Sequence, residues 1–420
     1  MTGQEKPAIA YLTGEYPRAT DTFIQREVAV LRALGHVVHT CSIRRTGAEH
    51  LVGDEQRQEA GGTFYVLAAA RAPLHLLACH VGALGRAPGL YLRALRLAWH
   101  TRQAGLRGML YQLFYFAEAG VLAAHLRRKR VRLLHNHIAK SSCTVAMLAS
   151  EMSGVPYSFT LHGPDIFFAP EHWRLDAKIA RARFVACISH FARSQAMVFS
   201  DQAHWRKLHI VHCGVEPERY AGQAGGAGRN LVFVGRLAAV KGIAVLLEAL
   251  ATLRESHPDL HLTLIGDGPE RVALEGRARQ LGVKGCVTFA GYRSQDEVAG
   301  TLRGSDLLVL PSFAEGVPVV LMEAMAAGLP VVATQVAGVS ELVEDGVSGR
   351  LVPPGDAGAL ADAIDTILRD PEEAVRLGQA GRAKVQAEFT VKAEAAWLSR
   401  LMTGYLEGEA PDTLRPEGKP

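Results

Sequence analysis

Apolar positions in the first half of this chain gather in short runs, and each run is followed by a polar or glycine-containing segment. The runs IAYL (9–12), VVHTCSI (37–43) and RLLHNHI (132–138) predict strands, as do YSFTLHG, FVACIS and LHIVHCG further on. Between the first two runs, residues 23–34 carry apolar side chains at helical spacing, and Gly35 ends the pattern. Strands that alternate with helices predict a parallel sheet with helical crossovers.

The same alternation starts again after a glycine-rich stretch, AGQAGGAGRN, at residues 221–230. The predicted strands of this second half are LVFVGRL, LTLIGDG, VTFAGY, LLVLPS, PVVAT and GRLVP. A segment without core residues between two repeating patterns is typical of a domain boundary. We therefore expect two doubly wound α/β domains, at 1–220 and 229–391. The final residues, EGEAPDTLRPEGKP, are too polar to pack in a core and are expected to be disordered.

Composition limits where the protein can work. The six cysteines are scattered without a CxxC pair, which is typical of a reducing compartment and argues against disulfides or a structural zinc site. The N-terminus has no charged segment followed by a long apolar run, so no signal peptide is expected. Polar residues interrupt every long apolar stretch, so we expect no membrane-spanning helix. These features predict a cytoplasmic protein.

Charge is divided unevenly between the two halves. Residues 1–219 carry 27 Lys and Arg against 16 Asp and Glu, a net charge of +11, whereas residues 220–420 carry 19 against 26, a net charge of −7. Residues 71–132 alone hold eleven basic residues and a single acid, Glu118. Halves of opposite charge usually meet different partners.

The loop after the first strand of the second half has the composition of an anion site. In FVGRLAAVKG (233–242), Gly235 follows the strand, and Arg236 and Lys241 flank a loop that leads into a helix. Two cations at a helix N-terminus oppose the helix dipole, which indicates that an anion binds between them. A diphosphate suits the pair, although two solvated surface charges would show the same pattern.

Two carboxylates mark the stretch PSFAEGVPVVLMEAMAAGLPVVAT at 311–334. Pro318 and Gly328 occupy the positions of a helix start and a C-terminal cap, which predicts a helix over 318–327. Glu315 precedes this helix, and Glu323 lies inside an otherwise apolar run. Carboxylates here could bind the vicinal hydroxyls of a sugar and of a ribose. Alternatively, Glu323 pairs with a core arginine and Glu315 is an ordinary loop charge.

Backbone amides add to this site. The amides of Gly316, Val317 and Val319 precede or begin the helix, so they could donate to an anion that lies beside the two carboxylates. A nucleotide sugar combines the three required groups: a ribose diol, a diphosphate and sugar hydroxyls.

These motifs resemble the retaining GT-B glycosyltransferases of family 4, through the E-x7-E spacing of Glu315 and Glu323 with VGRL…KG upstream. IGDGPE (265–270) and AGVSELVEDGVSGRLVPPGD (337–356) resemble the second domain of that family. YPRATDTFIQREVAVLRALGHVV and FTLHGPDIF resemble colanic-acid and related exopolysaccharide glycosyltransferases, although Asp21-Thr22 departs from the usual pair. The resemblance implies two Rossmann-like domains facing each other across a cleft.

The resemblance also implies roles in the second domain, which would bind the donor. Arg236 and Lys241 would hold the donor diphosphate and stabilise it as leaving group. Glu315 would bind the donor sugar, and Glu323 the ribose. The remaining donor-binding positions would be Gly235, Gly316 and Val317.

In the first domain, the resemblance places His162 of LHGPD near the transferred sugar, with Asp165 as a weaker candidate in the same loop. Gly14, in the loop expected after the first strand, would let the backbone approach the phosphate. The C-terminal helix, at about 392–407, would pack back on this acceptor-binding domain. His135 and His137 in HNH alternate along a strand, a poor spacing for a metal pair, and are expected to be structural.

The implied reaction moves a hexose from a UDP- or GDP-sugar to an acceptor hydroxyl with retention at the anomeric carbon. No D-x-D motif occurs in the chain, so we expect no metal and no other cofactor. Arg236, Lys241 and helix dipoles would take the place of the cation.

The basic first domain predicts where the acceptor lies. YLRALRLAWHTRQAGLR (91–107) and RRKRVR (127–132) combine apolar and cationic residues, which suits an anionic membrane surface. We expect a lipid-linked saccharide acceptor in exopolysaccharide or cell-surface glycan synthesis, at the inner face of the plasma membrane. A solvated arginine-rich helix pair over the core is the alternative.

Other functions fit less well. A catalytically silent subunit that binds sugar nucleotides for a polysaccharide assembly complex remains the main alternative, although all four charged motif residues are present. A sugar-nucleotide epimerase would carry a different signature. A dehydrogenase would need a G-x-G-x-x-G loop, which TGEYPRA lacks. Nucleic-acid binding is disfavoured because aromatic residues are sparse and no binding motif occurs.

Overall fold

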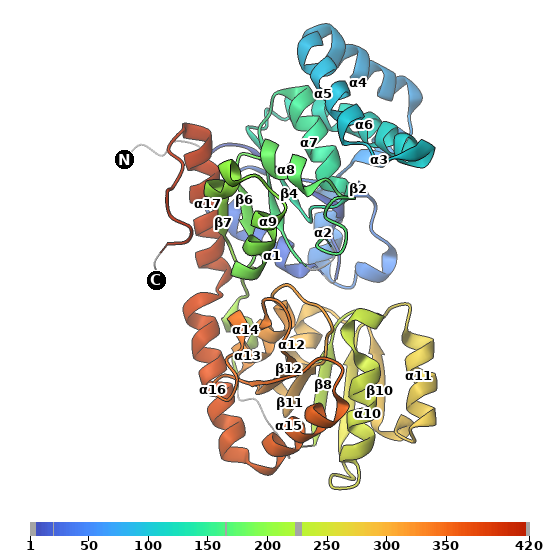
Figure 1. The fold of residues 1–420 in the computed structure, drawn as a ribbon, viewed down its shortest axis with the longest axis vertical. Coiled ribbons are helices and arrows are strands. Elements are labelled where there is room, and N and C mark those ends of the chain that lie inside the picture. Colours follow the sequence, from blue (N-terminus) through green and yellow to red (C-terminus); the bar gives the residue numbers. More distant parts are fainter. Residues whose placement is uncertain (1–5, 20, 164–165, 223–228, 417–420) are drawn as a thin grey trace. The chain divides into compact units, whose positions relative to one another are not determined.

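The computed structural model describes residues 6–19, 21–163, 166–222 and 229–416 (Figure 1). Its described residues divide into two compact units. The first takes its residues from 1–18, 24–212 and 395–417, and the second takes most of its residues from 213–394. Each unit is built around a parallel sheet, which confirms the predicted α/β fold class.

The first unit contains a seven-stranded sheet in the order β3-β2-β1-β4-β5-β6-β7. Every strand pair in it is parallel. The chain order therefore reverses direction at β1, so right-handed crossovers place helices on both faces of the sheet. The strands are β1 (Ile9–Glu15), β2 (Val38–Arg44), β3 (Phe64–Tyr65), β4 (Leu133–His137), β5 (Tyr157–Leu161), β6 (Val185–Cys187) and β7 (Leu208–Ile210).

The helices of this part of the chain include a three-helix insertion, α4 to α6, between the edge strand β3 and the central strand β4. Its three helices pack on one another, and α5 and α6 also contact α7. The helices are α1 (Thr22–Ala33), α2 (Asp54–Gly62), α3 (Val66–Ala70), α4 (Pro73–Arg86), α5 (Pro88–Thr101), α6 (Gly105–Arg128), α7 (Ser141–Ser153), α8 (Leu175–Arg181) and α9 (His190–Val198).

The second unit contains a six-stranded parallel sheet in the order β10-β9-β8-β11-β12-β13. Its chain order reverses at β8, as the first sheet does at β1. The strands are β8 (Asn230–Val234), β9 (His261–Ile265), β10 (Val287–Gly291), β11 (Leu307–Leu310), β12 (Val331–Thr334) and β13 (Arg350–Val352). The helices are α10 (Ile243–Leu253), α11 (Arg271–Gln280), α12 (Gln295–Arg303), α13 (Val319–Ala327), α14 (Val339–Leu342), α15 (Ala357–Arg369) and α16 (Pro371–Glu388).

The chain ends in α17 (Val391–Glu407), whose residues from Ala395 onward belong to the first unit. The Trp397 indole donates to the Ile210 carbonyl at 3.0 Å, and Ser399 contacts His36 at 2.7 Å. The expectation of a disordered tail is wrong for its described part. The amide of Ile210 donates to the Leu414 carbonyl at 3.0 Å, so the tail covers the otherwise open edge of β7.

One local expectation also needs correction. Gly14 lies within β1 rather than in a loop after it, because the parallel pairing of β1 with β2 continues to Glu15 and Arg44. The strand β3 escapes sequence reading because it has only two residues. Asp165 lies outside the described residues. Among the residues that the structure describes, no helix is both long enough and apolar enough to cross a bilayer.

Candidate active site

In the second unit, the loops after β8 and β11 meet where the strand order reverses. Parallel α/β sheets bind ligands at such points, beyond the carboxyl ends of the strands. Lys241 comes from the loop after β8, and Glu315 from the loop after β11. The Lys241 ammonium forms an ion pair with Glu315 Oε1, which also accepts from the Ser312 hydroxyl at 2.6 Å. Two predicted site residues, 74 positions apart, are therefore in direct contact.

The helix after Glu315 follows the prediction closely. Pro318 caps α13, which runs from Val319 to Ala327, and Gly328 closes it in the left-handed conformation with φ +75°. Glu323 is buried in this helix, and its Oε1 accepts from the Tyr220 hydroxyl at 2.8 Å. The Tyr220 hydroxyl is thus one partner of this buried carboxylate.

The start of α13 offers further donors. The amides of Gly316 and Val317 donate to no acceptor within the described part of the chain, although both residues are buried. Buried N–H groups are normally paired, so amides left over at a helix N-terminus are suited to an anion.

The loop after β8 is held by close backbone packing. Gly242 adopts φ +63°, and a Cβ on it would lie 2.0 Å from the Pro311 carbonyl oxygen. A Cβ on Gly235 would lie 3.1 Å from the Phe233 ring. Arg236 is exposed, and within the described residues its side chain makes no hydrogen bond or ion pair. Backbone packing thus fixes the loop that carries Lys241, whereas the Arg236 side chain is exposed and accessible to a ligand.

The first unit contains a polar cluster at the corresponding reversal of its sheet. A central strand of a parallel sheet is usually apolar throughout, yet β4 reads LLHNH and all five residues are buried. His137 ends β4, and His162 follows β5 directly. His137 Nδ1 lies 3.0 Å from His162 Nε2, and His137 Nε2 lies 3.0 Å from Glu27 Oε1.

Glu27, from α1, receives a second hydrogen bond at the same oxygen. The Tyr11 hydroxyl on β1 donates to Glu27 Oε1 at 2.7 Å. Burial, followed by the charge of Glu27, raises the pKa of Tyr11 well above its usual value, so the phenol keeps the proton that it donates. Tyr11, Glu27, His137 and His162 form one chain of hydrogen bonds, which we call the His162 chain.

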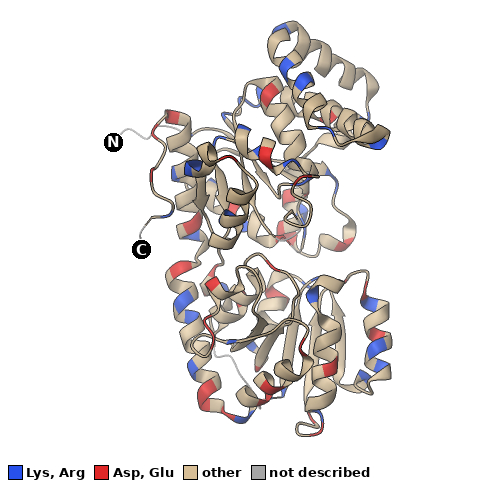
Figure 2. Ribbon diagram, in the orientation of Figure 1, with Lys and Arg blue, Asp and Glu red and all other residues tan. Residues whose placement is uncertain are grey.

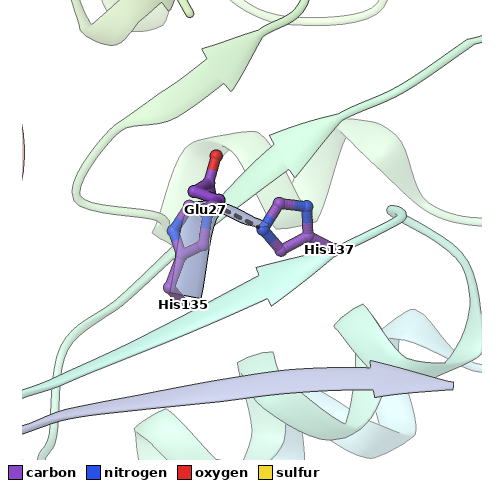
Figure 3. Close-up of side chains that lie close together, drawn as sticks. All are labelled: Glu27, His135 and His137. Atoms are coloured by element: carbon purple, nitrogen blue, oxygen red, sulfur yellow. Dashed lines mark hydrogen bonds and ion pairs between the residues drawn. The ribbon is translucent and has the colours of Figure 1, made fainter. Parts of the chain in front are cut away.

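His135 lies beside this chain but is not part of it (Figure 3). Its Nδ1 pairs with the Ser158 hydroxyl at 2.8 Å and its Nε2 with the Thr160 hydroxyl at 2.9 Å. Burial lowers the pKa of His135 well below its usual value, so the ring is neutral. The expectation of a structural role holds for this histidine.

Glu27, His135 and His137 are also the ligand types that bind metals, and their ligand atoms lie within 4.8 Å of one another. All four ring nitrogens of the two histidines are paired with protein groups. A metal ion would have to replace several of these hydrogen bonds. The arrangement is better described as a buried polar network.

Sequence reasoning identified His162 but missed its partners. His137 was grouped with His135, because the alternation HNH could not show that one ring pairs with hydroxyls and the other with a carboxylate. Glu27 looked like an ordinary helix residue, and it meets His137 from 110 positions away. The only available signal was the polarity of a strand that should be apolar.

Comparison with known folds assigns the architecture. The chain is similar to a sucrose-phosphate synthase from Thermosynechococcus elongatus, with a TM-score of 0.74 and 22% identity over 96% of this chain and all of that one. It is also similar to Anabaena HepE in complex with UDP and glucose, with a TM-score of 0.71 and 18% identity over 94% of this chain and all of that one. The fold is therefore GT-B.

Two family models place the chain within this class: Glycosyltransferase Family 4 over residues 22–219 and Glycosyl transferases group 1 over 221–384. A Bacillus subtilis protein, named as the teichuronic acid biosynthesis glycosyltransferase TuaC, is 31% identical over 62% of this chain and 68% of its own length. The chain belongs to this glycosyltransferase family.

Other relatives match over different lengths. The amylovoran biosynthesis glycosyltransferase AmsK of Erwinia amylovora is 35% identical over 44% of this chain. A Salmonella typhimurium protein, named as the colanic acid biosynthesis glycosyltransferase WcaL, is 26% identical over 94% of this chain and 99% of its own length. The match with AmsK covers 47% of that relative, so the chain spans about half of its length.

Proposed function

We propose that this protein transfers a hexose from a nucleoside-diphosphate sugar to a saccharide acceptor, with retention at the anomeric carbon. The contact of Lys241 with Glu315, beside the start of α13, is the observation that carries this proposal. It places a cation, a carboxylate and helix N-terminal amides at one point of the second unit. These groups match a diphosphate and the hydroxyls of its attached sugar.

The donor would exchange the internal ion pair for contacts with itself. Lys241 and Arg236 would bind the diphosphate oxygens, and Glu315 would accept hydrogen bonds from sugar hydroxyls. Glu323, held by Tyr220, would bind the ribose. HepE has been observed with UDP and with UDP-glucose, which supports a uridine nucleotide as the first donor to test.

The proposed step is a front-face displacement. The bond between C1 of the sugar and the diphosphate oxygen breaks, and a C1–O bond to the acceptor forms on the same face. The proton of the acceptor hydroxyl passes to the departing phosphate oxygen. Lys241, Arg236 and the α13 amides stabilise the negative charge that develops on the leaving group, without a metal ion.

The names of the relatives favour exopolysaccharide synthesis, since AmsK and WcaL are named for amylovoran and colanic acid. We therefore infer that the acceptor is a growing, lipid-linked saccharide. A catalytically silent subunit that binds donors without turnover is the second candidate function. A donor screen distinguishes it from a glycosyltransferase.

The test is a donor screen in EDTA with UDP-glucose, UDP-galactose, UDP-GlcNAc and GDP-mannose. Wild-type protein should bind one donor and slowly release its nucleotide, and Lys241→Ala and Glu315→Ala should lower that release by about 100-fold or more. Lys284→Ala and Glu255→Ala change exposed residues of the second unit and serve as matched controls. Binding without release would favour the silent subunit, whereas strict dependence on a divalent metal would contradict the mechanism.

The helices α4 to α6 carry the proposed membrane surface. Each has a stripe of exposed apolar residues at helical spacing: Leu74, Leu77, Val81 and Leu84 on α4, Leu92, Leu95 and Trp99 on α5, and Leu106, Leu110, Leu113 and Phe114 on α6. Leu74 and Leu106 expose 82% and 69% of their surface. Figure 2 shows Lys and Arg distributed along the same helices.

An anionic lipid surface suits this combination. The eleven basic residues and one acid between 71 and 132 favour lipids of opposite charge, and the apolar stripes could enter the headgroup region. We infer that the insertion binds the membrane that carries the acceptor. Vesicles of phosphatidylcholine with phosphatidylglycerol should sediment the protein, and vesicles of phosphatidylcholine alone should not. A Leu74→Ser, Leu106→Ser variant should bind less, and equal sedimentation by both vesicles would contradict the inference.

A further inference from the structure

Within the described part of the chain, Glu315 is held at only one of its two carboxylate oxygens. The Lys241 ammonium pairs with Oε1, and the Ser312 hydroxyl donates to the same atom at 2.6 Å. Oε2 accepts no hydrogen bond from the described residues, and it is not sealed from solvent. Because a carboxylate can accept hydrogen bonds at both oxygens, Glu315 keeps one oxygen for a ligand while the other is fixed.

The two donors to Oε1 differ in how easily they can leave it. Lys241 carries its ammonium on a flexible four-carbon stem, and its side chain is 22% exposed. Ser312 is fully buried, and its hydroxyl is attached directly to Cβ. A diphosphate would compete with Glu315 for the lysine. It could not displace the serine hydroxyl without rebuilding the loop.

The loop that carries Ser312 is fixed on both sides. The buried Thr334 hydroxyl, at the end of β12, donates to the Ser312 carbonyl. The next residue, Phe313, donates its amide to the Val240 carbonyl at 2.8 Å, which ties the loop to the segment that precedes Lys241. Ser312 therefore presents its hydroxyl to Glu315 from a rigid position.

We propose that Ser312 is a positioning residue, which holds Oε1 of Glu315 when Lys241 moves to the donor diphosphate and so keeps Oε2 towards the hydroxyls of the donor sugar. This inference rests on the proposed function, in which Glu315 binds the sugar. A buried carboxylate that lost both donors would be costly to leave unpaired. With the serine hydroxyl in place, the carboxylate keeps one donor and is already oriented when the sugar binds.

The two parts of the donor should then respond differently to the loss of Ser312. Glu315 meets the sugar and Lys241 meets the diphosphate, so recognition of the sugar should weaken while recognition of the nucleotide is unchanged. A serine that merely stabilised the loop would affect both parts, because the same loop leads into α13, whose first amides face the phosphates in the proposed complex.

Calorimetric titration in EDTA tests this difference with the nucleotide sugar that the donor screen selects and with its free nucleoside diphosphate, UDP-glucose and UDP being the first pair. Ser312→Ala should weaken binding of UDP-glucose about fivefold to tenfold and change binding of UDP by less than about twofold. Lys241→Ala should weaken both. Equal losses for the two ligands in Ser312→Ala, or no loss for either, would overturn the proposal.

Ser305→Ala is the matched control. Ser305 is also a buried serine of the second unit, and its hydroxyl donates to the Thr301 carbonyl at 2.8 Å. The substitution should change the binding of neither ligand. If Ser312→Ala fails to fold, Thr334→Val loosens the same serine through its carbonyl and should show the same selective loss for UDP-glucose. Its absence in a folded Thr334→Val protein would count against the proposal.

A second measurement does not depend on donor binding. Ser312→Ala should lower the urea midpoint of unfolding in the wild-type background and have little effect in Glu315→Ala, which lacks the carboxylate that the hydroxyl holds. An equal shift in both backgrounds would show that Ser312 does not hold Glu315 and would overturn the proposal. If wild-type protein binds no nucleotide sugar, the proposed function fails, and this cycle still decides whether the hydroxyl holds the carboxylate.

Discussion

Individual residues of the candidate site are held by partners that are remote in sequence. Glu323 sits in an apolar helix and is buried, and the Tyr220 hydroxyl, 103 positions away, donates to its carboxylate. A buried charge of this kind costs several kcal/mol unless hydrogen bonds compensate for it. The position of Glu323 could be predicted from sequence, but its partner could not, because nothing local marks Tyr220.

We expect Tyr220→Phe to lower the free energy of unfolding by about 1–3 kcal/mol, since it leaves one lone pair of a buried carboxylate without its donor. Urea denaturation of both proteins measures this difference. The matched substitution Tyr111→Phe, at an exposed tyrosine, should change stability by less than about 0.5 kcal/mol. An equal effect of the two substitutions would show that the Tyr220 hydroxyl does not stabilise Glu323.

At the scale of elements, the strands and α13 could be predicted well because buried parallel strands are continuous apolar runs and helix ends have local signals. The exceptions are instructive. β3 is too short to give a pattern, and Gly14 belongs to β1 because of its pairing with β2, which local sequence does not encode. The loop after β8 is positioned by backbone contacts that only the three-dimensional structure shows.

Gly242 illustrates such a contact. Gly242→Ala forces a Cβ into the left-handed region and to within 2.0 Å of the Pro311 carbonyl oxygen. We expect a loss of about 2 kcal/mol or more in the free energy of unfolding. Gly300→Ala, inside α12 with open space around its Cβ, is the control and should be neutral or stabilise by about 0.5–1 kcal/mol. Equal free energies of unfolding for the two variants would contradict the expected clash with the Pro311 carbonyl oxygen.

The insertion helix α6 contains a carboxyl group that should make stability depend on pH. Burial raises the pKa of Glu118 to about 7, against an opposing effect of Arg44. Because this pKa is higher in the folded state, the folded protein binds more protons than the unfolded protein between about pH 4.5 and pH 7. Stability therefore falls as pH rises through this window. The destabilisation from ionised Glu118 is absent below about pH 4.5 and complete above about pH 7.

Glu118→Gln removes this ionisation. It should raise the free energy of unfolding by roughly 1–2 kcal/mol at pH 8, after allowance for partial solvent screening, and by much less at pH 4.5. Thermal unfolding of both proteins across this range measures the difference. A gain at pH 4.5 as large as that at pH 8 would exclude ionisation as the cause.

At the scale of the whole molecule, the two units carry different chemistry on the same type of sheet. The basic first unit holds the His162 chain and the apolar insertion, and the second holds Lys241, Glu315 and α13. Family and fold could be predicted because several motifs occur in order; the family models confirm the family, and the two parallel sheets and the structural neighbours confirm the fold. The network behind His162 could not, because it joins residues from three separate segments.

The proposed metal-independent transfer with retention can be tested through the anomeric configuration of the first product. Wild-type protein in EDTA is given the α-linked nucleotide sugar that it hydrolyses, and 1H NMR follows the released hexose before mutarotation. We expect the α-anomer to appear first and Lys241→Ala to release almost none. Early release of the β-anomer, or release only after a divalent metal is added, would contradict it.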